Sequence, residues 1–372
     1  MTNGRRWLTA GAAVVLLGGV GFLASGAGGR GDRSFLDLGG PAASAAAPQR
    51  PAPTVRVTAV GDVLLGSTPK LPPRNGRTFF DAVRPRLTGD VVMGNLESPL
   101  TDRTRSTKCP AKPDDRCFAF RVPPGYARWI AGAGFTVMNV ANNHARDYGT
   151  GGLDDTTQAL RRFGVGHTGF AGQVTRVSVN GIRVAVLGFS PYGWTNSVLD
   201  VPRAAALVRT AAARADLVVV TMHAGAEGAD RAHVRRGPER FLGEDRGDPI
   251  RFAHAVVDAG ADLVVGHGPH VLRGMEFYRG RLIAYSLGNF AGYRTLSTAG
   301  PLGVGGILRA ELGADGSWAG GNLIGTRLVD GGLPALDPRR TGVQLVRTLS
   351  ASDFPRSAAR TAADGAIGRA AG

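Results

Sequence analysis

Short runs of aliphatic and β-branched residues recur along the chain and alternate with stretches of helical periodicity. The runs predict buried strands at residues 55–60, 90–93, 135–140, 182–187, 216–221, 261–265 and 282–285. Helices are predicted at residues 125–134, 153–163 and 249–260, with Gly134, Gly164 and Gly260 where C-caps are expected. Strands that alternate with helices indicate an α/β fold in which helices cover buried sheets.

The same pattern divides the chain into parts. Residues 54–347 contain the strands and helices, and we predict that they form one large domain with a glycine-rich, hairpin-like stretch after Leu308. Residues 30–53 form an Ala/Pro/Gly-rich linker. Residues 348–372 are rich in Ala and Arg and are predicted to be a flexible tail, because such a segment can bury little apolar surface.

Residues 1–29 have the layout of an export signal or a signal anchor. Arg5 and Arg6 precede an uncharged stretch from Trp7 to Gly29. That stretch is long enough to span a bilayer, since about 20 apolar residues suffice. Cleavage after residues 43–45 and retention as a single membrane anchor both stay open. We therefore expect an extracytoplasmic protein that is membrane-anchored or secreted.

The two cysteines agree with export. Cys109 and Cys117 flank a polar loop that contains two prolines. In an oxidising compartment they can form a disulfide that closes a short ring. Two thiolates without nearby Cys or His partners make only half of a zinc site, so a structural disulfide is the expected role.

Composition and charge narrow the functional classes. Hydrophobic residues make up 43% of the 372 residues, enough for a substantial core. The formal net charge is +15 and comes almost entirely from arginine, since lysine occurs only at Lys70, Lys108 and Lys112. Such a surface attracts polyanions, but the chain lacks the interleaved basic and aromatic pattern of nucleic-acid modules, so no nucleic acid is expected as a partner. A P-loop sequence is absent, and Ser98 and Ser190 lack the flanking glycines of a nucleophile elbow.

Polar residues with metal-binding chemistry follow five of the predicted strands. They are Asp62 after the first strand, Asn95 and Glu97 after the second, Asn143, His144 and Asp147 after the third, His223 and Glu227 after the fifth, and His267 and His270 after the sixth. Ligands bind beyond the carboxyl ends of the strands in open α/β sheets, so we expect these side chains to converge. Oxygen and imidazole ligands without thiolates favour divalent ions such as Mn, Fe or Zn.

A structural role stays open for two of these residues. Asp62 and Asn143 are also of the types that cap loops after strands. His167, His233 and His254 lie in loop or helix contexts without partners, and we expect them to be surface or structural residues.

The order of these motifs resembles one known family. The series is Gly-Asp at 61–62, Gly-Asn-Leu-Glu at 94–97, Asn-Asn-His-x-x-Asp-Tyr-Gly at 142–149, His-x-Gly-x-Glu at 223–227 and Gly-His-x-Pro-His at 266–270. It is similar to the CapA family, the capsule or poly-γ-glutamate synthesis proteins of the metallo-dependent phosphatase superfamily, over residues 55–290. The resemblance implies a four-layer α-β-β-α sandwich that binds two divalent metal ions.

The resemblance also implies roles for single residues. The implied metal ligands are Asp62, Glu97, Asn143, His223, His267 and His270. His144 is the implied catalytic residue, which would orient the scissile group or protonate a leaving group. Asp147, Glu227 and Asn95 would orient the ligands. Leu64 departs from the superfamily pattern, which usually has a histidine at that place, and so puts the first metal in doubt.

Three functions from different classes follow. The first is a metal-dependent hydrolase or transferase in the assembly of an anionic envelope polymer such as poly-γ-glutamate. The second is a non-catalytic subunit of a membrane polymer synthase or exporter, which would hold the polymer on a basic face. The third is an extracytoplasmic phosphoesterase with an unrelated substrate. The chemistry of the site has to decide among them, because one fold hosts many functions.

Overall fold

The computed structural model describes residues 53–109 and 117–369. The predicted export signal and nearly all of the linker lie outside these residues. No helix in the described ranges is long and apolar enough to cross a membrane. Cys109 and Cys117 form a disulfide, as predicted.

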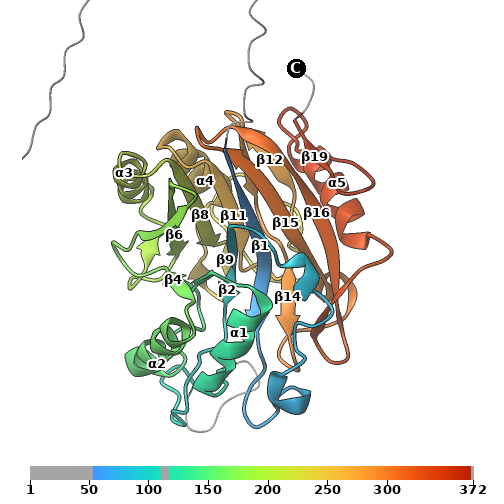
Figure 1. The fold of residues 1–372 in the computed structure, drawn as a ribbon. Coiled ribbons are helices and arrows are strands. Elements are labelled where there is room, and N and C mark those ends of the chain that lie inside the picture. The colour runs from blue at the N-terminus through green and yellow to red at the C-terminus, as the bar shows by residue number, and fades with distance from the viewer. Residues whose placement is uncertain (1–52, 110–116, 370–372) are drawn as a thin grey trace, which may run out of the picture. The chain divides into compact units, whose positions relative to one another are not determined.

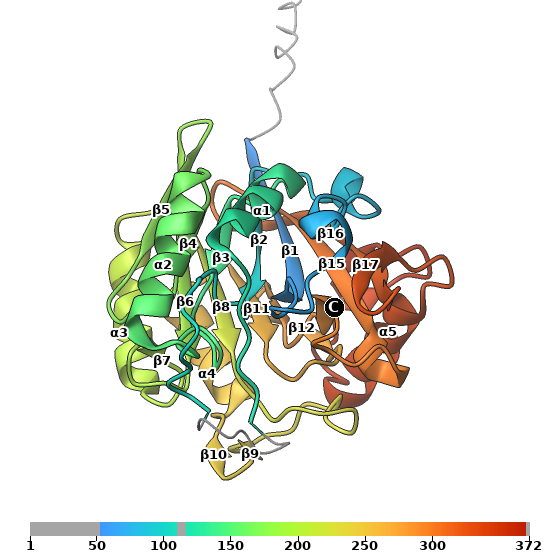
Figure 2. The same cartoon turned by 90° about the horizontal axis from the view of Figure 1, so that it is seen from below.

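The first sheet has eight strands in the order β17-β16-β15-β1-β2-β3-β4, and β14 pairs with the end of β1. The strands are β1 (Thr54–Leu64), β2 (Val91–Leu96), β3 (Val137–Asn139), β4 (Gly166–Thr168), β14 (Asn289–Gly292), β15 (Val304–Gly313), β16 (Trp318–Val329) and β17 (Leu333–Leu336). β1 to β4 run parallel, whereas β15, β16 and β17 pair in antiparallel fashion. The parallel half therefore ends β1, β2 and β3 at one edge (Figure 2).

The second sheet has seven strands in the order β12-β13-β11-β8-β6-β5, with β7 beside β6. The strands are β5 (Thr175–Val179), β6 (Ile182–Ser190), β7 (Asn196–Ser197), β8 (Leu217–His223), β11 (Leu263–His267), β12 (Met275–Tyr278) and β13 (Arg281–Ala284). Its centre, made of β6, β8, β11 and β13, is parallel. The predicted runs of Val, Leu and Ile form these strands because a sheet covered on both faces needs apolar residues on both.

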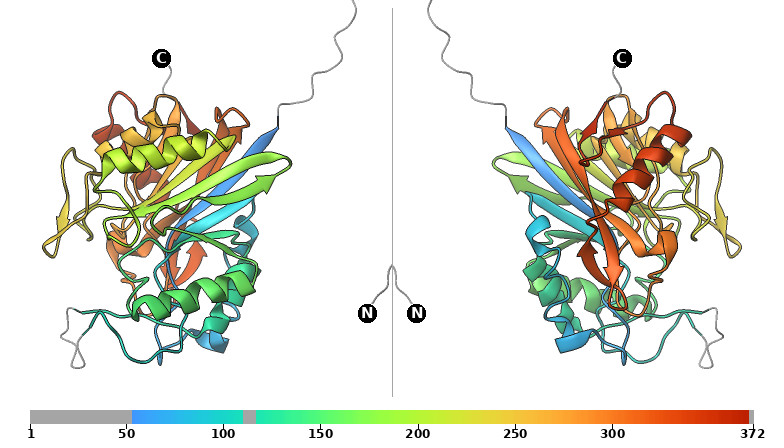
Figure 3. Two further views of the ribbon diagram at one scale, coloured as in Figure 1. Left: turned by 90° about the vertical axis from the view of Figure 1, so that its left-hand side faces the viewer. Right: turned by 90° about the vertical axis from the view of Figure 1, so that its right-hand side faces the viewer.

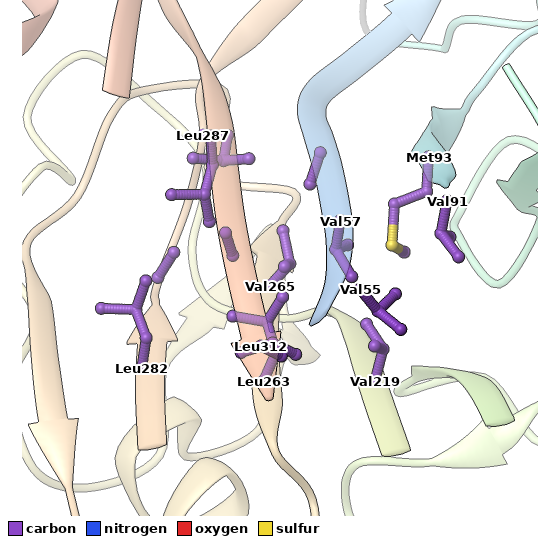
Figure 4. Close-up of a cluster of buried hydrophobic side chains, with 14 of the residues drawn as sticks. Val55, Val57, Val91, Met93, Val219, Leu263, Val265, Leu282, Leu287 and Leu312 are labelled. Atoms are coloured by element: carbon purple, nitrogen blue, oxygen red, sulfur yellow. The ribbon is translucent and has the colours of Figure 1, made fainter. Parts of the chain in front are cut away.

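Helices cover the outer face of each sheet (Figures 1 and 3). The first sheet packs against α1 (Ala127–Ala133) and α2 (Gly149–Arg162), and the second packs against α3 (Val201–Ala212) and α4 (Pro249–Asp258). Between the sheets lies a core of fully buried aliphatic side chains, among them Val57, Val219, Val265 and Leu312 (Figure 4). Each such side chain contributes roughly 1.5–3 kcal/mol on burial. The four-layer α-β-β-α arrangement is confirmed.

The capping residues and the apolar periodicity predicted some of the helices but not all of them. α1 ends at Gly134, whose φ of 106° is the left-handed C-cap that glycine favours. α4 begins after Asp248, whose side chain accepts a hydrogen bond from the backbone N–H of Arg251. α3 was not predicted, although Asp200 caps it in the same way by accepting from Arg203. Its buried face consists mainly of alanines, which make a weak apolar pattern.

The prediction of a flexible tail from residue 348 is wrong for residues 348–369. They continue α5 (Thr341–Asp353) and form β18 (Arg360–Thr361) and β19 (Ile367–Gly368). Val346, Leu349 and Ile367 are buried, and α5 contacts β12 as well as β15 and β16. The few apolar residues of this segment are spaced so that they meet the edge of the inter-sheet core, which composition alone does not reveal.

Candidate metal centre

The candidate residues lie at the carboxyl ends of strands from both sheets. Asp62 and Asn95 are paired in register on β1 and β2, and His223 and His267 are paired on β8 and β11. His270 lies in the turn that follows β11. Because the parallel strands of each sheet end at a common edge, packing of the two sheets brings these side chains into one buried cluster.

Two carboxylates and three imidazoles meet there. Asp62, Glu97 and His270 each offer a ligand atom, and these atoms lie within 4.8 Å of one another. Nδ1 of His270 lies 3.1 Å from Oδ2 of Asp62. Nδ1 of His223 lies 3.1 Å from Oε1 of Glu97, and Nδ1 of His267 lies 3.8 Å from Oδ1 of Asp62. The structure thus brings together all the ligands that the resemblance implied except Asn143, which lies on a neighbouring loop.

Asn95 holds the two carboxylates in place. Its amide N–H groups donate to Oδ1 of Asp62 at 2.8 Å and to Oε1 of Glu97 at 2.9 Å. Its carbonyl oxygen accepts from the amides of Asn139 at 2.9 Å and Asn142 at 3.1 Å. The orientation of the Asn95 amide is therefore fixed from both ends, and the two carboxylates are held in one arrangement relative to each other.

In the loop after β3, the adjacent residues Asn142 and Asn143 have different roles. Oδ1 of Asn142 accepts from the backbone N–H groups of His144 and Ala145 at 3.0 and 2.9 Å, so Asn142 caps the loop. Asn143 is half-buried, and its buried Oδ1 has no hydrogen-bond partner in the described residues. The capping alternative raised for Asn143 therefore belongs to its neighbour, and Asn143 keeps a free ligand atom.

His144 belongs to a short charged chain. Its Nδ1 lies 2.9 Å from Oδ2 of Asp147, and Nζ of Lys108 lies 3.2 Å from the other carboxylate oxygen. Lys108 also approaches Nδ1 of His144 to 3.1 Å. A carboxylate can only accept, so the contact with Asp147 assigns the proton to Nδ1 of His144, and the ammonium of Lys108 donates to the other oxygen of Asp147 rather than to Nδ1. This tautomer leaves Nε2 of His144 as the reactive nitrogen.

The turn after β11 needs its glycine and strains its histidine. Gly268 has a φ of 105°, and a Cβ at this position would lie 3.2 Å from the ring of His223. His270 has a φ of 60°, which is uncommon for a non-glycine residue. Its Nδ1 lies 2.9 Å from Oδ1 of Asn289, whose amide donates to the carbonyl of Leu302. The turn thus aims the His270 imidazole at the two carboxylates.

The electrostatics of the centre favour a bound cation. Burial acts to raise the pKa of Asp62, but the hydrogen bond and the charge of His270 outweigh it and lower that pKa to about 2. Burial and the charge of Asp62 raise the pKa of Glu97 to about 8. Burial acts to lower the pKa of His270, but Glu97 and Asp62 raise it to about 10. Glu97 and His270 therefore bind protons where a cation would otherwise balance the charge, and metal binding would release these protons.

The other two histidines are held neutral. Burial and the charge of Arg246 lower the pKa of His223 to about 3. Burial lowers the pKa of His267 to about 4. Neutral imidazole is the form that ligates metal ions.

The donor set fits a divalent ion. Five buried ligand atoms of this region have no hydrogen-bond partner among residues 53–109 and 117–369: Oε2 of Glu97, Oδ1 of Asn143, Nε2 of His223 and both ring nitrogens of His267. Leaving a buried polar atom unpaired costs about 1–3 kcal/mol, so a ligand is expected to satisfy them. Leu64 is fully buried and apolar, so it adds nothing to this donor set.

Glu227 links the centre to a buried arginine. Its Oε2 lies 3.7 Å from Nε2 of His270, and its Oε1 lies 2.8 Å from Nη2 of Arg246. Arg246 directly follows the hairpin of β9 (Arg240–Phe241) and β10 (Glu244–Asp245), and its side chain is only 3% exposed. Glu227 therefore lies between two cationic groups and can orient His270.

Sequence reasoning did not assign a role to several residues that contact the candidate ligands. They are Lys108, Asn139, Asn142, Arg246 and Asn289. Asn139, Asn142 and Asn289 stood in strand-end motifs, and their polar character among apolar neighbours was the available signal. Lys108 and Arg246 come from loops that only the tertiary fold brings to the site.

The remaining histidines that were expected to be structural lie in other contacts. Nδ1 of His233 lies 2.7 Å from Asp353, and Nε2 of His254 lies 2.7 Å from Glu276. His167 lies near Arg161, and burial together with that charge lowers its pKa to about 4.

These features define an α-β-β-α sandwich protein with a buried acidic and imidazole cluster that could hold a divalent metal ion. Residues 56–293 match the family described as "Bacterial capsule synthesis protein PGA_cap". The chain belongs to this family, as the order of its motifs suggested.

Among curated relatives, "Capsule biosynthesis protein CapA" of Bacillus anthracis is 34% identical over 260 residues, which cover 63% of this chain and 59% of that protein. "PGA biosynthesis protein CapA" of Bacillus subtilis (strain 168) is 33% identical over 251 residues, which cover 62% and 61%. The chain thus spans about three fifths of the length of these relatives. A solved structure of a 5'-nucleotidase precursor from Thermus thermophilus superposes with a TM-score of 0.41 at 15% identity, over 73% of this chain and 54% of that one, which is too distant to support an argument.

Proposed function

We propose that this capsule-synthesis family member acts outside the cytoplasm on an anionic envelope polymer of the poly-γ-glutamate type, through a divalent-metal centre. The observation that supports this proposal most directly is the set of unpartnered, buried ligand atoms around Asp62 and Glu97. A cluster that buries unpaired carboxylate and imidazole atoms loses stability unless a cation satisfies them.

Each residue of the centre has a proposed task. Asp62, Glu97, His223, His267 and His270 would hold the metal, and Asn143 would add an amide oxygen. A divalent ion in such a site supplies a Lewis acid that polarises substrate oxygens and lowers the pKa of water.

The proposed acid is His144. With its Nδ1 proton donated to Asp147, its Nε2 can take up a proton and deliver it to a leaving group. The Asp147 carboxylate would stabilise the resulting imidazolium, and Nζ of Lys108 lies 3.2 Å from its other oxygen. This arrangement supports hydrolysis or transfer of an acyl or phosphoryl group, and the polymer of the related proteins makes an amide-linked polycarboxylate our preferred substrate class.

The proposed location follows from two features of the chain. Residues 1–29 have the layout of an export signal or anchor, and the Cys109–Cys117 disulfide agrees with an oxidising compartment. Membrane retention through the N-terminal segment would place the chain beside membrane-bound synthase subunits.

A second candidate is a non-catalytic subunit that holds the polymer for a synthase or exporter. The observation that favours it is Leu64, which fills a usual ligand position with a buried apolar side chain. In this alternative the protein binds the polymer but does not catalyse a reaction on it.

The test compares purified full-length protein with its H267A and H144A variants. Metal content is measured by mass spectrometry, and hydrolysis is measured on poly-γ-glutamate and on a phosphodiester. We expect H267A to lose metal and activity, and H144A to keep metal but lose activity. The control is H233A, which removes an exposed histidine paired with Asp353. If both site variants support normal polymer production in cells, the subunit alternative replaces the enzymatic proposal.

A further inference from the structure

A basic groove lies on the first sheet, apart from the metal centre. It has a volume of about 650 Å³ and is bordered by four arginines: Arg86, Arg309, Arg327 and Arg340. Arg309 lies on β15 between Leu308 and Ala310, both of which belong to the core between the sheets. Since successive side chains of a strand point to opposite faces, Arg309 lies on the outer face. In Figure 1, β15 and β16 are not covered by α1 or α2.

In the part of the chain that the structure describes, the arginines of the groove have no carboxylate partners. Within residues 53–109 and 117–369, none of the four guanidiniums pairs with an acidic oxygen within 4.0 Å. Two aspartates also line the groove, but both accept hydrogen bonds from nearby backbone N–H groups. Asp337 accepts from Arg339 and Thr341, and Asp364 accepts from Ala366. Four arginines against two aspartates leave an excess of two positive charges.

Arg309 is held in place with a donor unused. Its Nη2 donates to the carbonyl of Arg86 at 2.8 Å and to Oγ1 of Thr88 at 3.3 Å. Its Nε is buried and has no partner among the described residues. Burial and the nearby charges of Arg86 and Arg56 lower the pKa of Arg309. Cations that the fold keeps close together against their repulsion form a site that an anion would stabilise.

The floor of the groove is apolar. Ile324 and Leu336 line it between the arginines. Poly-γ-glutamate has two methylene groups and one pendant carboxylate in each residue of its backbone, so it can place its methylene groups on such a floor and its charges on the rim. A bare phosphodiester chain makes less use of the floor.

We propose that this groove is a second, non-catalytic binding site that holds a stretch of polycarboxylate chain, with its carboxylates on Arg309 and the three surrounding arginines. The proposal rests on the proposed function, because it takes the polymer to be the one that the metal centre would process. Arg309 pairs with Thr58 on β1, four residues before Asp62. At about 3.3 Å per residue, the groove and the centre are separated by roughly 13 Å along the strand. A chain bound in the groove would be retained near the centre between reaction steps.

The test measures binding of a fluorescent poly-γ-glutamate oligomer to the full-length protein by anisotropy, at two salt concentrations. R309Q removes the central guanidinium. R86Q/R327Q removes two exposed guanidiniums that make no hydrogen bond among the described residues, so folding is not at risk. We expect each to weaken binding about tenfold and to reduce the salt dependence. The control is R209Q, which removes an exposed arginine of α3, and its affinity should stay within about twofold of the parent.

The outcomes separate this inference from the proposed function. If the groove variants bind the oligomer as the parent does, the groove is not a polymer site, whatever the metal centre does. If H267A loses metal and activity but still binds the oligomer, both proposals stand. Competition with inorganic polyphosphate of equal charge tests the ligand class: stronger binding of polyphosphate than of poly-γ-glutamate would overturn the assignment to carboxylates.

Discussion

The carboxylate of Asp147 accepts the Nδ1 proton of His144 at 2.9 Å and thereby sets the tautomer of the proposed acid. Replacing it by an amide in D147N keeps the shape but lets the side chain donate to Nδ1. We expect activity to fall by about 10–100-fold, the usual cost of removing such a supporting group, with metal content unchanged. Steady-state hydrolysis and metal analysis check this. D155N, at a surface pair with Arg103, is the control. An active D147N enzyme would show that His144 does not act through this tautomer.

Metal binding should stabilise the folded chain. A ligand that binds only the native state adds about 2.7 kcal/mol at a concentration of 100 times its Kd. We expect Mn, Fe or Zn to raise the melting temperature of chelator-treated protein, and E97Q and H223A to abolish the rise. Thermal unfolding with each ion provides the measurement. Identical melting curves with and without all three ions would contradict the assignment of the site.

Gly268 should not tolerate a side chain. In G268A the new Cβ would lie 3.2 Å from the His223 ring and the backbone would keep a φ of 105°. We expect a destabilisation of about 1–3 kcal/mol and weaker metal binding. G164A separates strain from crowding, because Gly164 also has a positive φ but nothing lies within 4 Å of its added Cβ. Equal metal affinities for the two variants would rule out the proposed contact with His223.

Arg273 should stabilise the loop after β8. It is 1% exposed and donates to both oxygens of Glu239 and to the carbonyls of Arg231 and Ala226. R273M leaves the Glu239 charge without its partner, and we expect a loss of about 3–5 kcal/mol in urea unfolding.

The matched control for R273M is an exposed ion pair. R183Q breaks the contact between Arg183 and Asp216, which should cost no more than about 1 kcal/mol. Similar losses for the two variants would mean that Arg273 is not the anchor of the loop.

Glu276 should contribute a pH-dependent part of the stability. Burial acts to raise its pKa, but hydrogen bonds from His254, Ser357 and Tyr285 outweigh it and hold the pKa below the ordinary value of 4.5. The stabilisation is therefore present above pH 4.5 and is lost as the pH falls through the lower folded-state pKa. Melting temperatures measured between about pH 6 and pH 3 should fall more steeply for the parent than for E276Q. Parallel curves would remove Glu276 as a contributor.

Much of the fold could be predicted because its strands are buried on both faces. Continuous runs such as Val218–Val220 and Val264–Val265 are visible without any knowledge of partners. The unpredicted α3 and the packed segment 348–369 bury alanines and a few spaced apolar residues. Those contacts become apparent only when the sheets against which these segments pack are known.

The residues of the candidate site likewise fall into those that the local sequence predicts and those that depend on long-range packing. Asp62 and His267 were predictable because they directly end or follow strong apolar strands. Asn289 and Lys108 are far from these residues in sequence, and their contacts with His270 and His144 depend on long-range packing. Residues at the end of a strong apolar strand are visible in one sequence, whereas contacts between segments far apart in the chain are not, whether the partner lies on a strand, as Asn289 does, or in a loop, as Lys108 does.

The two halves of the metal centre come from different sheets: Asp62 and Glu97 from the first, and His223, His267 and His270 from the second. An ion bound there would be coordinated by residues of both sheets and would link the two layers. Without the ion, the contact between the two sheets would be the least stable part of this region. Loss of metal would therefore weaken the packing of the sheets against each other before it affected the strand pairing within either sheet.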